Sequence, residues 1–153
     1  MKNFNAKLII KAGLLVGTLD ILAAFLNFYI KTEKNPTIVL KYIASAVFGK
    51  SAMTGGEGMI VFGLLLHFAI AFAFTIIFAL SYAKLWAWFR NSSLIAILYG
   101  IFIWLVMNLL VVPNSQAAKI PFSWSSASIS CGILIICIGF PLAYLFRKNK
   151  PII

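Results

Sequence analysis

Charged side chains are scarce in this sequence, and this scarcity excludes a water-soluble fold. Lysine, arginine, aspartate and glutamate make up 10% of the 153 residues, whereas 63% are hydrophobic. The mean hydropathy is +1.03. Soluble domains carry roughly 25% charged and 45 to 50% apolar residues. A soluble protein of this size could not cover its surface with so few charges, so we expect an integral membrane protein.

Residues for redox, metal and nucleophilic chemistry are also nearly absent. Cys131 and Cys137 lie six positions apart, which on one helix is about 9 Å and on different faces, too far for a disulfide. His67 has no second histidine with which to complete a metal or haem site. No phosphate-binding glycine loop or nucleophile with a base is visible. We therefore expect no metal, no cofactor and no catalytic residues, and a non-enzyme is favoured.

Acidic residues number only three, Asp20, Glu33 and Glu57, which leaves a net charge of +10. In a soluble protein this charge would suggest nucleic-acid binding. Here the basic residues lie at the ends of apolar runs, where they contact lipid headgroups. The bilayer is thus the expected partner, and nucleic acid is not.

Four apolar runs reach the roughly 17 to 25 residues that a helix needs to cross a bilayer. They cover residues 12–30, 59–83, 94–112 and 127–146. None shows the alternating polar pattern of an outer-membrane barrel strand, and no linker divides the chain. We predict an all-α membrane protein, a four-transmembrane-helix bundle forming a single domain over residues 1–153.

A shorter apolar segment, residues 36–49, lies between the first two spans. Asn35 followed by Pro36 is typical of a helix start. The segment is too short to cross, so we predict an interfacial helix. An ordinary connecting helix packed on the outer mouth is the alternative.

The basic residues also predict the orientation. Eight of them belong to the N-terminus, the second loop and the C-terminus, and five to the other two loops. By the positive-inside rule we expect both termini to lie in the cytoplasm.

Polar residues inside the spans are the candidate functional residues, because each is costly in hydrocarbon. They are Asp20, Asn27, His67 and Asn108. Counted from the span centres at about 1.5 Å per residue, Asp20 lies near the midplane and the others about 6 to 9 Å towards the outer side. We predict a ligand or proton site formed by these four residues.

Glycines accompany these polar residues at helical spacing. Gly13 and Gly17 share a helix face with Asp20 and Asn27, and Gly63 precedes His67 by four positions. We expect these three glycines to be helix-packing residues that let neighbouring helices approach. His67 is expected to hydrogen-bond Asp20 or Asn27.

Three segments carry a family resemblance. They are Leu15-Val16-Gly17-Thr18-Leu19-Asp20, the stretch from Gly63 to His67, and Tyr99-Gly100-Ile101-Phe102-Ile103-Trp104. This combination resembles small bacterial four-helix inner-membrane proteins that have no assigned activity. The resemblance implies the same location and topology, and it implies no mechanism.

Three functions remain open from the sequence. In a binding or transport protein for a small ligand, Asp20 would carry the coupled proton; small multidrug transporters use an acid in the first of four helices within a homodimer, but their aromatic pattern is missing here. In a scaffold or accessory subunit, the polar layer would only fix helix packing. An intramembrane enzyme acting on lipid has the weakest support. A cavity reaching Asp20 would favour binding, and a satisfied Asp20–His67 contact would favour the scaffold.

Overall fold

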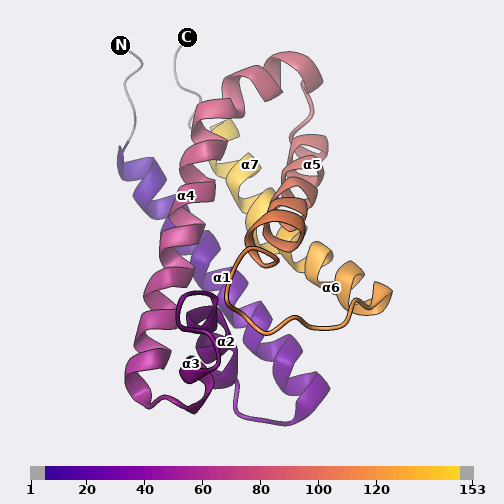
Figure 1. Cartoon of the computed structure of the whole chain (residues 1–153). Coiled ribbons are helices and arrows are strands. Elements are labelled where there is room, and N and C mark those ends of the chain that lie inside the picture. The colour runs from indigo at the N-terminus through magenta and orange to yellow at the C-terminus, as the bar shows by residue number, and fades with distance from the viewer. Residues whose placement is uncertain (1–5, 149–153) are drawn as a thin grey trace.

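The structure is a computed structural model that describes residues 6–148, in which every regular element is a helix (Figure 1). In chain order the elements are α1 (Ala6–Thr32), α2 (Thr37–Phe48), α3 (Ser51–Thr54), α4 (Glu57–Phe89), α5 (Ser92–Leu105), η1 (Val106–Val111), α6 (Trp124–Leu134), η2 (Ile135–Gly139) and α7 (Phe140–Lys148). Four continuous helices are long and apolar enough to cross a membrane: α1, α4, α5 with η1, and α6 through α7. The predicted fold class, with its short helix between the first two spans, is confirmed. These helices indicate a multi-pass membrane protein.

The helices extend beyond the apolar runs that predicted them. The second loop was expected over residues 84–93, but α4 continues to Phe89 and only Arg90 and Asn91 connect it to α5. Arg90 adopts a left-handed conformation with φ of 50°. The Asn91 side chain accepts hydrogen bonds from the first backbone N–H groups of α5, as an N-cap does. Capping, rather than loss of hydropathy, therefore ends these helices.

Spans three and four each contain a π-helical turn just before a proline. Proline lacks the amide hydrogen, and its ring clashes with the carbonyl four residues earlier. For Pro113 and Pro141 these carbonyls belong to Leu109 in η1 and Cys137 in η2. The wider π turn η2 accommodates both effects without breaking span four, whereas span three ends at Val111, two residues before Pro113.

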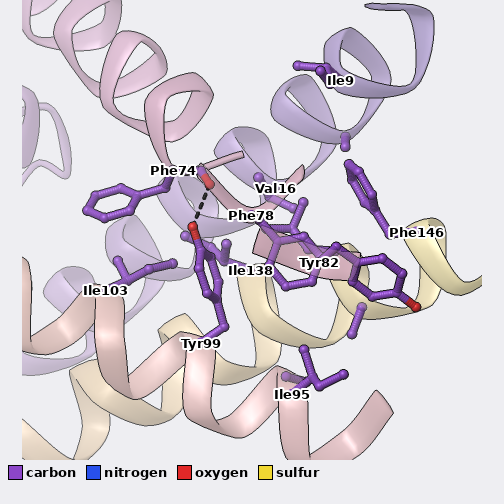
Figure 2. Close-up of a cluster of buried hydrophobic side chains, with 14 residues drawn as sticks. Ile9, Val16, Phe74, Phe78, Tyr82, Ile95, Tyr99, Ile103, Ile138 and Phe146 are labelled. Atoms are coloured by element: carbon purple, nitrogen blue, oxygen red, sulfur yellow. Dashed lines mark hydrogen bonds between the residues drawn. The ribbon is translucent and has the colours of Figure 1, made fainter. Parts of the chain in front are cut away.

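An aromatic core joins the helices near the turn at residues 90–91, which we call the α4–α5 end. Phe78 of α4 is fully buried, and its ring meets those of Tyr99 in α5 and Phe146 in α7 edge-on, with centroids 4.7 and 5.4 Å apart. The Tyr99 hydroxyl donates to the carbonyl of Phe74 at 2.5 Å (Figure 2). This half of the bundle is tightly packed.

Glycines set the spacing between α1, α4 and α2. A Cβ atom added to Gly13 or Gly17 would lie 2.4 or 2.8 Å from a phenylalanine ring of α4. At Gly63 it would lie 2.0 Å from the carbonyl oxygen of Leu40 in α2. The α4 and α2 backbones therefore approach closely at Gly63, and Gly13 and Gly17 leave room for phenylalanine rings of α4 against α1.

The opposite half of the bundle, which we call the α2 end, is looser. Neither η1 nor α6 contains a buried residue, although both belong to membrane-crossing helices. Figure 1 shows α6 diverging from α4 towards this end. The divergence leaves space among the helices.

Candidate functional site

A cavity of about 470 Å³ fills the space between the diverging helices. It is bounded by α1, α2, α4, α5 with η1, and α6 with η2. The four polar residues predicted within the spans, Asp20, Asn27, His67 and Asn108, all line it. Ser130 of α6 lines it as well. The structure thus brings the predicted site residues to one hollow, from three separate spans.

The cavity walls are mainly apolar. Phe74, Ile103, Ile138, Leu66 and Leu134 all line the cavity. Ligand pockets are typically about 300 to 1,000 Å³ in volume and carry a few polar groups on apolar walls. In size and lining the cavity therefore has the properties of a small-molecule site.

Asp20 lies near the middle of the 27-residue helix α1 and is partly exposed. Within residues 6–148 its carboxylate makes no hydrogen bond and no ion pair, although it lines the cavity. An acid that served only to fix helix packing would be expected to have such a partner. Asp20 is instead available to a group that enters the cavity.

His67 makes a different hydrogen bond from the one expected. Its Nε2 lies 2.8 Å from the carbonyl oxygen of Gly17, and no hydrogen bond joins it to Asp20 or Asn27 in the described part of the chain. A carbonyl can only accept, so Nε2 carries the hydrogen and donates. This hydrogen bond joins α4 to α1 at Gly17.

The asparagines retain hydrogen-bonding capacity. The Asn108 Nδ2 donates to the Trp104 carbonyl one turn earlier, at 2.9 Å, which leaves its Oδ1 without a bond among the described residues. Trp104 Nε1 donates to Ser130 Oγ at 2.9 Å and ties α5 to α6. Asn27 makes no side-chain hydrogen bond within residues 6–148. Both amides could bind a ligand.

A cover at the α2 end was not foreseen from the sequence. The backbone N–H of Gln116 donates to the carbonyl of Ala46 at 3.0 Å, and the hydroxyl of Tyr42 donates to the carbonyl of Ala118 at 3.1 Å. These bonds fasten the connection before α6 onto α2. Tyr42 lines the cavity, and burial raises the pKa of its hydroxyl above the ordinary 10.0. Its place on the apolar face of α2 was the only signal in the sequence.

Exposed residues at the last turn of α1 form the rim. Lys31 and Thr32 line the cavity and are exposed, and Lys31 Nζ donates to Ser126 Oγ at 3.3 Å. Eleven residues separate Lys31 from Asp20, about 16 Å along a helix. The cavity therefore extends from the α2 end to the middle of α1.

Metal binding receives no support from the described residues, which contain no group of three or more histidine, cysteine, aspartate or glutamate side chains able to hold an ion. The two cysteines are free and half-buried.

No protein-family model, curated protein or solved structure matches this chain. The resemblance to small bacterial inner-membrane proteins therefore identifies no family. Function has to be argued from the cavity itself.

Proposed function

We propose that this chain is a binding protein or proton-linked transporter for a small ligand in the inner membrane, with Asp20, Asn27, His67 and Asn108 as its polar site. One observation carries the proposal: an apolar cavity reaches the Asp20 carboxylate, which has no hydrogen-bond partner in the described part of the chain. An unpaired intramembrane acid is typical of proton and substrate pathways.

The predicted orientation places the α2 end, and with it the cavity mouth, on the outer side. Transport would require a second arrangement in which Asp20 is reached from the α4–α5 end, where the aromatic core is now closed. A protein that only binds its ligand needs no such change.

A scaffold role is favoured by one contact. The hydrogen bond from His67 to the Gly17 carbonyl joins α4 to α1, which suits a packing residue. That contact explains His67 but leaves Asp20 and the unengaged amide groups without a role. Binding accounts for more of the cavity lining.

The experiment compares Asp20→Asn with Glu57→Gln, which also removes one acid but lies outside the cavity lining. Purified proteins are screened for thermal stabilisation by a panel of amines, amino acids, fatty acids and neutral lipids. A ligand at about one hundred times its Kd adds about 2.7 kcal/mol, or roughly 5 to 10 °C in Tm for a chain of this size. We expect Asp20→Asn to fold and to lose this stabilisation, and Glu57→Gln to keep it.

Two outcomes would contradict the proposal. If Asp20→Asn lowers the Tm of the protein alone while no panel compound stabilises either protein, the scaffold role is supported. If Asp20→Asn changes neither stability nor stabilisation by a compound that binds, the polar site has been placed wrongly.

A further inference from the structure

The charges of the cavity are separated along α1. Among its lining residues Asp20 is the one acid and Lys31 the one lysine. Lys31 lies at the rim, about 16 Å from Asp20 along the helix, and donates to Ser126. His67 directs Nε2 at the Gly17 carbonyl. His67 is an electrostatic neighbour of Asp20, but within residues 6–148 no hydrogen bond or ion pair joins the Asp20 carboxylate to a cationic side chain.

Such a carboxylate must be neutralised when the cavity is filled. Removing a charge from water is costly unless it is paired or protonated. A ligand can supply the missing charge as an ammonium group, which donates up to three hydrogen bonds. A divalent metal ion suits this place less well, because calcium takes six to eight oxygen ligands and Asp20 is the one acid in a mainly apolar lining.

The apolar cavity walls and the asparagine side chains indicate the chemistry of the rest of the ligand. Phe74, Ile103 and Ile138 line the same cavity as Asp20 and favour a ligand that carries a hydrocarbon or aromatic body as well as the charged group. Asn27 lies seven residues from Asp20 on α1, about 10 Å along the helix, and could bind a hydroxyl or carbonyl further out. We infer that the cavity binds amphiphilic monoamines, with the ammonium group at Asp20 and the apolar body towards α4, α5 and η2. This inference rests on the proposed binding function.

The test uses three probes with one body and different head groups: 4-phenylbutylamine, 4-phenylbutan-1-ol and 4-phenylbutyrate. Each is titrated calorimetrically into the purified chain in a neutral maltoside detergent at neutral pH, where the amine is charged. The charged bond should make the amine roughly ten- to a hundredfold tighter than the alcohol, and the carboxylate should bind most weakly. Asp20→Asn should remove the advantage of the amine, and Glu57→Gln should retain it.

Other outcomes separate the ligand class from the binding function. Ala24→Phe places a ring in the cavity lining and should block every probe. If amine and alcohol bind equally and Ala24→Phe blocks both, the amine inference is overturned while the binding function stands. A preference for the carboxylate that is lost in Lys31→Gln also overturns it. If no probe binds the unaltered chain, the inference fails, and the binding function is judged separately by whether Ala24→Phe abolishes stabilisation by the wider panel. The ranking of the three probe affinities on the unaltered chain tests the amine inference even if Asp20→Asn does not fold.

Discussion

Replacing Gly139 with alanine tests the close approach of spans three and four. A Cβ atom at Gly139 would lie 2.2 Å from the carbonyl oxygen of Ala96 and 3.0 Å from its carbonyl carbon. Both atoms belong to the α5 backbone, so no side-chain rotation can relieve the overlap. The two helices would have to separate by roughly 1 Å to restore ordinary contact in a close-packed interior.

The free energy of unfolding should fall as a result. Forcing an extra methyl group into a packed interior costs about 1 to 3 kcal/mol. The higher helix propensity of alanine offsets up to about 1 kcal/mol of this cost. Because backbone atoms form the obstacle, we expect a net loss of about 1 to 2 kcal/mol, which corresponds to a Tm lower by about 2 to 8 °C.

Gly132 is the matched control on the same span. An added Cβ there meets nothing within 4 Å, so Gly132→Ala should gain up to about 1 kcal/mol from helix propensity alone. The assay is thermal unfolding in detergent, followed by circular dichroism for both variants and the unaltered chain. If Gly139→Ala were as stable as Gly132→Ala, the close approach of Gly139 in η2 to the α5 backbone would be refuted.

Two further substitutions probe single hydroxyl groups. Tyr99→Phe removes the donor to Phe74 and should cost about 0.5 to 1.5 kcal/mol, measured as a lower Tm, whereas Tyr144→Phe, at a residue 64% exposed, should leave the Tm unchanged. Burial raises the pKa of Tyr42 above 10.0, so its bond to Ala118 should stabilise the fold below that pH and be lost only as the pH rises through the raised pKa. The difference between ultraviolet titrations of the unaltered chain and Tyr42→Phe isolates this ionisation, and a midpoint at or below 10.0 would contradict the burial.

The spans were predictable because a long apolar run has few alternatives in a membrane protein. The ends of the helices were less predictable than the spans themselves. Hydropathy falls at Lys84, yet the residues that follow still favour a helix, and α4 ends only where Arg90 adopts a left-handed conformation and Asn91 caps α5. Helix ends are decided by backbone hydrogen bonding, which a hydropathy pattern does not register.

Part of the candidate site followed from helical periodicity alone. Spacings of three and four residues place Gly17, Asp20 and Asn27 on one face, and this face meets α4 and the cavity. The partner of His67 could not be predicted in the same way, because a shift of α4 by one turn along α1 would offer the ring a different carbonyl. The bonds made by Tyr42 likewise depend on where a distant connection crosses α2.

The positions of the glycines explain why the cavity lies in one half of the bundle. Gly13 and Gly139 draw helices together towards the α4–α5 end, where the aromatic core fills the remaining space. Gly132 lies in α6, yet an atom added there would touch nothing within 4 Å, so α6 packs closely against no other helix at this position. Asp20 and Asn27 lie where that close packing ends and α1 faces the cavity. Helix packing explains the glycines but not these two polar side chains, and an occupant of the cavity would explain both.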